Sequence, residues 1–245
     1  MSGVKTAVRT LRLYEAFAAS KRALTLQELA KQLGMPVSSC FALVRTLLER
    51  GYLYETARRN GYYPTRRMLE YNSEISLHDR LLERASPHLE RLRDRTCETV
   101  VLSKRQGVRV IYLAVLESPQ IIRCTVPAGT LRPVHSTATG KALLSVLGDA
   151  ERDRILDDAG MPRLTPRTVT SRSVLEAELA ASRARGWFDN EGESVSDLRA
   201  VALPVQIGND DFAVTIMGPM PRMTQNLNAL VKALRSACAD MQDSL

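Results

Sequence analysis

Residues 25–53 have the sequence TLQELAKQLGMPVSSCFALVRTLLERGYL, which predicts two short helices joined by a tight turn. Thr25 and Glu28 form a capping box, in which each side chain accepts a hydrogen bond from a free N–H group at a helix start. Gly34 ends that helix, and a second helix follows and ends at Gly51. Two helices joined by a short turn that contains glycine predict a helix-turn-helix.

The second helix, which begins near Val37 or Ser38, has two different faces. The stripe expected to be buried consists of Cys40 or Phe41 together with Val44, Leu47 and Leu48. The face expected to be exposed carries Ser38, Ser39, Ala42, Arg45, Glu49 and Arg50. In helix-turn-helix proteins the second helix enters the major groove of DNA, so this outer face is the candidate reading surface.

Two further segments complete an N-terminal module. Upstream, residues 8–17 show helical spacing of apolar side chains. Downstream, two short tyrosine-rich strands flank Asn60-Gly61, a strong signal for a two-residue hairpin turn. Arg58 and Arg59 precede this turn, which indicates a basic wing. The tyrosines are interpreted as cross-strand packing, with base stacking as the alternative.

The basic residues are concentrated in this module. Residues 1–70 hold twelve Lys/Arg and five Asp/Glu, so the entire formal net charge of +7 falls there and the rest of the chain is neutral. Such segregation predicts a surface that binds phosphate, although chance clustering also produces basic patches on proteins without nucleic-acid partners.

Composition predicts a soluble cytoplasmic protein. Hydrophobic residues make up 44% and charged residues 25%, the usual balance for globular proteins. The four cysteines form no Cys-x-x-Cys pair and no secretory signal is evident, which favours free thiols. No run of eighteen apolar residues occurs, so we expect no membrane partner.

The rest of the chain alternates strand and helix patterns. Residues 66–96 look helical with a break at Ser86-Pro87, and strands are expected at 99–102, 108–116, 121–126, 201–207 and 212–217. Helices are expected at 138–147, 151–159, 173–185 and 224–241. This order predicts an α+β fold with an antiparallel sheet. The predicted domains are a winged helix-turn-helix at 1–72, a helical linker at 73–95 and a second domain at 96–245.

The sequence lacks a complete phosphate-binding loop, a nucleophile elbow and a spaced metal site. The segment from His135 to Ala142 lacks the first glycine and the final Ser/Thr of a phosphate-binding loop. No Gly-x-Ser-x-Gly elbow is present, and the three histidines have no metal-site spacing. Glu191 and Glu193 could act as an acid/base pair but are more typical of a solvated loop. We therefore predict no catalysis, no cofactor and no metal.

Three blocks of this sequence resemble the IclR family of transcriptional regulators. The first spans residues 26–53, the second is Arg132-Pro133-x-His135-Ser136-Thr137-Ala138-x-Gly140-Lys141, and the third runs from Arg185-Gly186-Trp187 to Pro204-Val205. The resemblance implies a winged-helix domain, a linker helix used for dimerisation and a GAF-like effector domain. It further implies a homodimer or homotetramer on double-stranded operator DNA, regulated by a small-molecule effector.

At the DNA end this chain departs from the family. A basic residue and an arginine that relatives commonly carry correspond to Val37 and Ala42 here, so the operator sequence of relatives cannot be transferred. We expect base reading by Ser38, Ser39 and Arg45, with apolar contacts to thymine methyl groups from the two substituted positions. The predicted DNA-contacting residues are Thr25, Val37, Ser38, Ser39, Ala42, Arg45, Arg58 and Arg59.

The effector pocket is predicted at the start of the helix after His135. Free N–H groups and the helix dipole there favour a carboxylate, although capping by the local Ser and Thr side chains also explains those residues. Positions that supply polar contacts in relatives correspond to less polar residues here. The predicted lining is Ile121, Cys124, Ala138, Thr139, Asn190, Ala200, Thr215 and Met217. We expect an effector with an apolar or aromatic body and one acidic group.

Two other hypotheses remain at this stage. The C-terminal domain could serve only to oligomerise a DNA-binding protein, without a ligand. Alternatively, a small-molecule enzyme could be fused to a regulatory head. A ligand that changes operator affinity would separate the leading hypothesis from the first alternative, and turnover of a bound compound would support the second.

Overall fold

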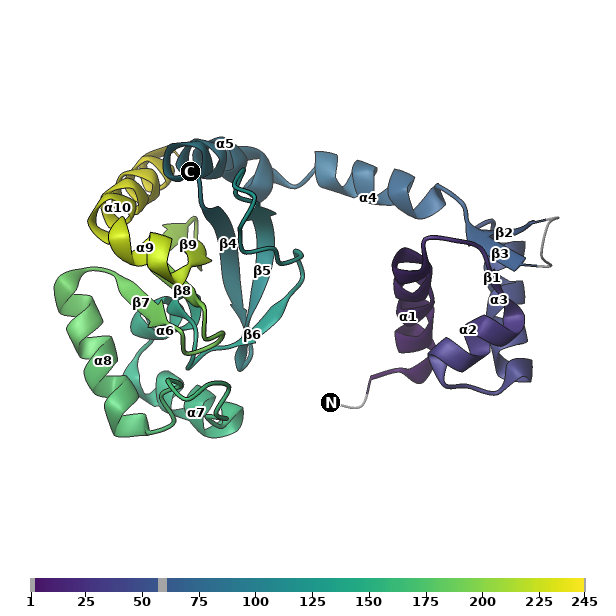
Figure 1. Cartoon of the computed structure of the whole chain (residues 1–245), viewed down its shortest axis with the longest axis horizontal. Coiled ribbons are helices and arrows are strands. Elements are labelled where there is room, and N and C mark those ends of the chain that lie inside the picture. Colours follow the sequence, from purple (N-terminus) through teal and green to yellow (C-terminus); the bar gives the residue numbers. More distant parts are fainter. Residues whose placement is uncertain (1–2, 57–60, 245) are drawn as a thin grey trace. The chain divides into compact units, whose positions relative to one another are not determined.

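The structure is a computed structural model that describes residues 3–56 and 61–244 (Figure 1). Its contacts divide the chain into two compact units, Met1–Asp79 and Arg80–Leu245, and each is described by itself. In the described part of the chain, no helix is both long enough and apolar enough to cross a membrane.

The first unit is a winged helix-turn-helix. Its elements are α1 (Lys5–Ser20), β1 (Leu24–Thr25), α2 (Leu26–Leu33), α3 (Val37–Glu49), β2 (Leu53–Thr56), β3 (Gly61–Pro64) and α4 (Arg67–Leu77). The strands form an antiparallel sheet in the order β1-β3-β2. Leucines from α1, α2 and α3 pack with Phe17, Cys40 and Val44 into one core. This fold was predicted from the sequence and is confirmed.

The residues predicted to begin and end α2 do so in the structure. The Thr25 N–H donates to Glu28 Oε2 at 2.8 Å, and the Glu28 N–H donates to Thr25 Oγ1 at 3.3 Å, which confirms the capping box. Gly34 follows with φ +60°, a conformation that residues with a Cβ adopt only at a cost. The turn into α3 is therefore encoded locally.

The hairpin forms, but the prediction of a two-residue Asn-Gly turn was wrong. Gly61 lies in β3 opposite Thr56, so residues 57–60 connect the strands. Gly61 also pairs with Thr25 of β1, and an added Cβ would lie 3.3 Å from the Leu24 carbonyl oxygen. The glycine therefore serves the close approach of β1, a strand too short to be recognised in the sequence.

Helix α4 is attached to the first unit by Arg67. This guanidinium donates to the Arg50 carbonyl at 2.5 Å and to the Tyr71 hydroxyl at 3.0 Å, and it lies 5.1 Å from the Tyr52 ring centre. Beyond that contact α4 buries no residue. Its large apolar side chains are exposed: Leu69, Tyr71, Ile75 and Leu77.

The second unit is built on a six-stranded antiparallel sheet in the order β6-β5-β4-β9-β8-β7. The strands are β4 (Thr99–Gln106), β5 (Arg109–Leu116), β6 (Leu131–Pro133), β7 (Phe188–Glu191), β8 (Leu198–Ile207) and β9 (Asp210–Pro219). The helices are α5 (Arg80–Thr96), α6 (Ala138–Ser145), α7 (Asp149–Ala159), α8 (Arg172–Arg185), α9 (Met220–Gln225) and α10 (Leu227–Ser244). The predicted α+β class is confirmed.

Helices cover both faces of this sheet. Alternate strand residues pack with α5, α9 and α10 in one core and with α6, α7 and α8 in another. Figure 1 shows α5 and α10 side by side. The alternation follows from the two-residue period of β-strands, which sends neighbouring side chains to opposite faces.

Two sequence predictions in this unit were wrong. Pro87 lies inside α5 rather than at a helix break, because Ala85, Leu89 and Leu92 bury one continuous face of α5 against the sheet. Residues 121–126 form no strand; in this connection between β5 and β6, residues 121–123 are exposed, whereas Cys124 and Val126 are buried. The segment 73–95, expected to be a linker, comprises the end of α4 and most of α5, and α5 packs into the second unit.

Candidate nucleic-acid interface and ligand cavity

The outer face of α3 is fully available to a partner. Cys40 and Val44 are buried with no exposed surface, and they hold the helix against the first unit's core. The opposite face carries the exposed residues at helical spacing: Val37, Ser38, Ser39, Phe41, Ala42 and Arg45. Of the two candidates for the buried stripe, Cys40 is therefore correct.

Phe41 is a surface residue that the sequence did not assign to this face. Half of its surface is exposed, and Val37, one turn before it on α3, is 48% exposed. Ser38, Ala42 and Arg45 share this side of the helix, since residues three, four and seven apart align. Spacing alone left Cys40 and Phe41 as alternatives, because both are at helical spacing from Val44, and only the structure decides between them.

Arg45 and Thr25 already have partners within the first unit. The Arg45 Nε lies 2.7 Å from Glu49 Oε1, one turn along α3, and both side chains are mostly exposed. An exposed pair of this kind is worth little, so the guanidinium can exchange its partner. Thr25 is half-buried and held by the capping box. The predicted contacts Arg58 and Arg59 lie outside the described residues.

A cavity in the second unit, named the inner cavity here, collects most of the predicted pocket residues. The predicted residues that line it are Cys124, Ala138, Thr139, Asn190, Ala200, Thr215 and Met217. They come from α6, the sheet and the β5–β6 connection, so distant segments of the chain meet there. Ile121 does not reach it: the residue is 96% exposed, because it lies in the exposed part of the β5–β6 connection and not in the expected strand.

The α6 end of the inner cavity keeps free backbone donors. Thr137 Oγ1 accepts from the Gly140 N–H at 3.0 Å, and Thr139 Oγ1 lies 2.7 Å from Thr215 Oγ1. Local capping thus satisfies one amide, and no described residue accepts from the N–H of Ala138 or Thr139. Two unpaired N–H groups at a helix start favour an anion.

The floor of the inner cavity is apolar and tightly packed. Cys124 Sγ lies 3.4 Å from Met217 Sδ, and burial raises the pKa of the Cys124 thiol, which keeps it neutral. Ala200 faces Met217 across β8 and β9. The enclosed volume is about 40 Å³, smaller than the pockets of drug-sized ligands, so a larger molecule requires movement of the lining.

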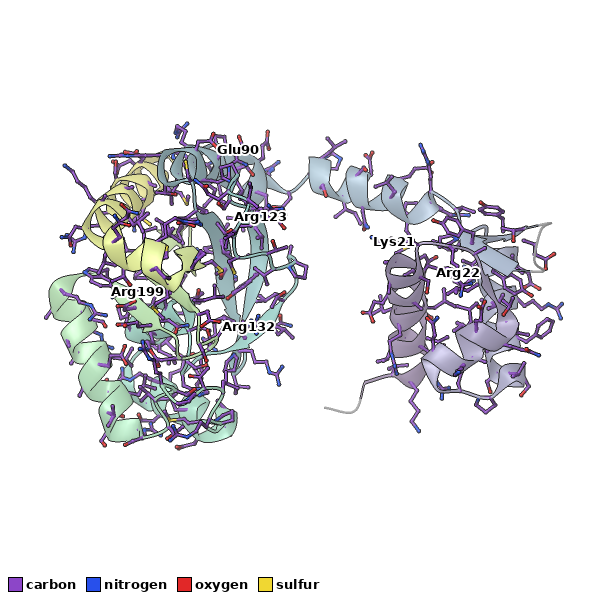
Figure 2. All side chains as sticks on the ribbon, viewed as in Figure 1. Lys21, Arg22, Glu90, Arg123, Arg132 and Arg199 are labelled. Atoms are coloured by element: carbon purple, nitrogen blue, oxygen red, sulfur yellow. The ribbon has the colours of Figure 1, made fainter. Side chains whose placement is uncertain are left out.

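Several lining residues were missed by the sequence reasoning. They are Tyr112, Val126, Arg132, Thr137, Ser194, Val195, Leu198 and Arg199. Arg132 and Arg199, labelled in Figure 2, bring two cations to a cavity expected to rely on backbone donors alone. Arg132 belongs to the quoted sequence block beside Pro133, which was interpreted as a motif rather than as a contact.

The segment after β7 is anchored through a buried ion cluster. Lys141 of α6 has no exposed side-chain surface; its Nζ contacts Glu193 and lies 2.5 Å from Glu178. Asn190 Oδ1 accepts from the Glu193 N–H at 2.8 Å, and Asn190 Nδ2 donates to Ser194 Oγ at 2.7 Å. The interpretation of Glu193 as part of a solvated loop was wrong, because its charge partner lies 52 residues earlier in the chain.

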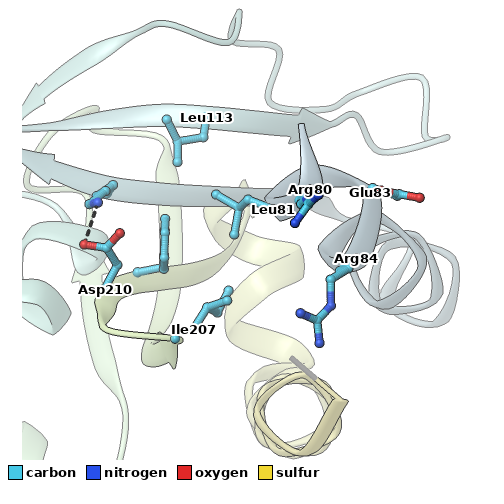
Figure 3. Close-up of a pocket in the computed structure, with 10 residues that line it drawn as sticks. Arg80, Leu81, Glu83, Arg84, Leu113, Ile207 and Asp210 are labelled. Atoms are coloured by element: carbon cyan, nitrogen blue, oxygen red, sulfur yellow. Dashed lines mark ion pairs between the residues drawn. The ribbon is translucent and has the colours of Figure 1, made fainter. Parts of the chain in front are cut away.

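A second depression lies elsewhere on this unit (Figure 3). Its volume is about 770 Å³, and it is lined by Arg80, Leu81, Glu83, Arg84, Lys104, Leu113, Ile207, Gly208, Asp210 and Phe212. Lys104 and Asp210 form an ion pair of 2.8 Å in its wall. It is a surface groove and holds none of the predicted residues, so the enclosed inner cavity is the better candidate for a small ligand.

Among the described residues, no group of three or more His, Cys, Asp or Glu side chains could hold a metal ion. The four cysteines form no disulfide.

Comparisons with known proteins cover nearly the whole chain. Residues 6–57 match the model of the IclR helix-turn-helix domain, and residues 75–243 match that of the bacterial transcriptional regulator IclR C-terminal domain. The HTH-type transcriptional regulator BhcR of Paracoccus denitrificans is 30% identical over 98% of this chain and 86% of its own length.

Solved structures resemble this chain over nearly its whole length. A transcriptional regulator from Rhodococcus sp. RHA1 superimposes with a TM-score of 0.81 at 29% identity, covering 99% of this chain and 98% of that one. An IclR homolog from Microbacterium hydrocarbonoxydans, solved in complex with 4-hydroxybenzoate, has a TM-score of 0.78 at 24% identity and covers 98% of both chains.

Proposed function

Because the chain belongs to the IclR family of transcriptional regulators, we propose that it binds operator DNA through α3 and the wing and that an organic acid in the inner cavity modulates this binding. The helix-turn-helix makes the protein a DNA-binding transcriptional regulator. The relatives are regulators rather than enzymes, which supports a role without catalysis.

The contacts proposed for DNA follow from the exposed face of α3. Arg45 reads a guanine, because a guanidinium fork matches the two acceptors of that base in the major groove. Ser38 and Ser39 bond base edges or phosphates, while Val37 and Ala42 contact thymine methyl groups. Phe41 joins this apolar set because half of it is exposed beside them. Thr25 holds the N-terminal end of α2 in position. Arg58 and Arg59 contact the phosphate backbone.

The proposed ligand is an acid with an apolar or aromatic body. One observation carries this: the inner cavity joins two free N–H groups of α6 to a floor of Ala200, Cys124 and Met217. Met217 is the side chain that moves when the ligand binds, because an unbranched thioether adapts easily to a new shape. The 4-hydroxybenzoate complex belongs to a protein that shares the fold; the ligand class for this chain depends on its own lining.

The proposed assembly is a homodimer, or a homotetramer made of two dimers. One recognition helix covers too few base pairs to specify an operator, so two copies are needed. The exposed apolar side chains of α4 supply a surface that a second copy would bury.

An affinity measurement with operator DNA tests this function. An operator is first selected from a random DNA pool with the full-length protein, and its dissociation constant is measured by fluorescence anisotropy with and without candidate acids. We expect an aromatic acid to change the constant at least tenfold. If no ligand changes it, the second domain only oligomerises. Calorimetry that shows tight binding of a two- or three-carbon oxo-acid and none of aromatic acids contradicts the proposed ligand class.

A further inference from the structure

Two arginines line the inner cavity, and only one of them is neutralised. Arg199 is 7% exposed, and its guanidinium lies 2.6 Å from Asp189 Oδ2. Arg132 is half-buried on β6, where the strand places it opposite Val110 of β5. Among the ion pairs of the described residues, none includes Arg132.

The groups that surround Arg132 are neutral. Burial raises the pKa of Tyr112 to about 12, although the charge of Arg132 and its hydrogen bond to the phenol oppose this rise, so the phenol stays protonated at pH 7. Burial also raises the pKa of the Cys124 thiol. The carboxylates closest to Cys124 have other partners: Glu117 pairs with Arg123 at 3.0 Å, and Glu98 pairs with Arg222.

A cation that lines a cavity without an ion-pair partner favours an anionic occupant. Withdrawing a charge from water costs free energy unless an opposite charge compensates it. A guanidinium offers parallel N–H donors that match the two oxygens of a carboxylate, and such charged hydrogen bonds are stronger than neutral ones. The two free N–H groups of α6 line the same cavity and add to this preference.

We propose that Arg132 is the counter-ion of the effector, binding its carboxylate directly and selecting acids over neutral molecules of the same shape. The inference deepens the proposed function and depends on it. Arg199 does not take this role, because Asp189 already occupies its guanidinium on the cavity wall.

The test compares an acid with its amide on matched variants of the full-length protein. Calorimetry measures binding of benzoate, 4-hydroxybenzoate and phenylacetate, and of the corresponding primary amides. We expect the wild type to prefer the acid at least tenfold. In Arg132→Gln the acid should bind roughly 10- to 100-fold more weakly, as expected for the loss of charged hydrogen bonds, with amide binding unchanged. Arg132→Lys should recover part of the loss.

Arg123→Gln is the matched control, since it removes an arginine of the connection that leads into β6, and this arginine does not line the inner cavity. It should bind acids like the wild type. Thermal unfolding without ligand separates ligand binding from a structural role: Arg132→Gln should not lower the melting temperature. Equal acid binding by the wild type and Arg132→Gln overturns the role of Arg132 alone. A wild type that binds none of the acids overturns the proposed ligand class and this inference with it.

Discussion

At the scale of single residues, the α3 surface depends on which side chains the core leaves outside. Arg45 is the one long basic side chain on the face formed by Val37, Ser38, Ser39, Phe41, Ala42 and Arg45. Its exposed pair with Glu49 is weak, so DNA can replace the carboxylate.

We predict that Arg45→Ala weakens operator binding by roughly 1–3 kcal/mol and relaxes the preference at one base position, because a bidentate guanine contact is lost. Anisotropy titrations against an operator series with single-base changes measure both effects. The control is Glu49→Gln, which removes the intrahelical partner and should leave binding unchanged or tighter. Uniform weakening at all sequences by Arg45→Ala would mean that Arg45 contacts only phosphate.

Met217 sets the size and polarity of the inner cavity from the final strand. Its sulfur touches that of Cys124, and its backbone pairs with Ala200 of β8. We predict that Met217→Ser shifts the preference toward smaller and more polar acids, because the side chain shortens and gains a hydroxyl. Calorimetry with benzoate and pyruvate measures the ratio of the two affinities. An unchanged ratio would show that Met217 does not contact the ligand.

At the scale of elements, α6 holds the segment after β7 through Lys141. The ammonium also donates to the Asp189 carbonyl at 3.0 Å, so one buried cation connects α6, α8 and this segment. Burial raises the pKa of Glu193, with Lys141 opposing the shift, so the carboxylate depends on the cation to stay charged.

We predict that Lys141→Met destabilises the protein by about 3–5 kcal/mol, because it leaves buried carboxylates without a counter-charge. Denaturant unfolding measures this loss. Adding Glu193→Gln should restore part of the stability, since the double variant no longer buries that charge. If the double variant is as unstable as the sum of both single variants, the two side chains are not coupled.

The DNA contacts of the wing were predicted from the hairpin signal and from Arg58 and Arg59, which lie outside the described residues. We predict that Arg58→Ala weakens binding to all sequences alike and reduces the slope of log affinity against log salt by about one, because one phosphate contact is lost. Arg235→Ala, in the second unit, is the control and should leave the slope unchanged. A change in operator preference at constant slope would refute the wing assignment.

At the scale of the whole molecule, the proposed recognition of an operator depends on association of two copies. We predict that Ile75→Glu on α4 raises the dimer dissociation constant and weakens operator binding on the order of 100-fold, because two linked half-site contacts become independent. Ile75 is 69% exposed, so the substitution should leave the monomer folded. Sedimentation velocity measures the assembly.

Ser73→Glu is the matched control, because it adds the same charge to an exposed position of α4. It should preserve the dimer if the apolar stripe of α4 is the interface. Normal association of Ile75→Glu would place the interface elsewhere on the chain.

The sequence by itself determined the features that depend on neighbours along the chain. The capping box of Thr25 and Glu28, the left-handed Gly34 and the helical stripes of α1 to α3 need only a few consecutive residues. The same holds for the concentration of positive charge in residues 1–70. These signals were sufficient for the α+β class and the winged helix-turn-helix, and with the family resemblance they gave about half of the cavity lining.

Tertiary structure alone decided the features that depend on residues far apart in sequence. Gly61 is a strand residue because β1 approaches it, Pro87 stays helical because α5 packs on the sheet, and Ile121 is exposed because its loop crosses the surface. The place of Arg132 in the inner cavity, without an ion pair among the described residues, became visible only in the folded arrangement. Local pattern cannot show such pairings, since a strand register or a buried ion pair is set by the free energy of the whole packed arrangement.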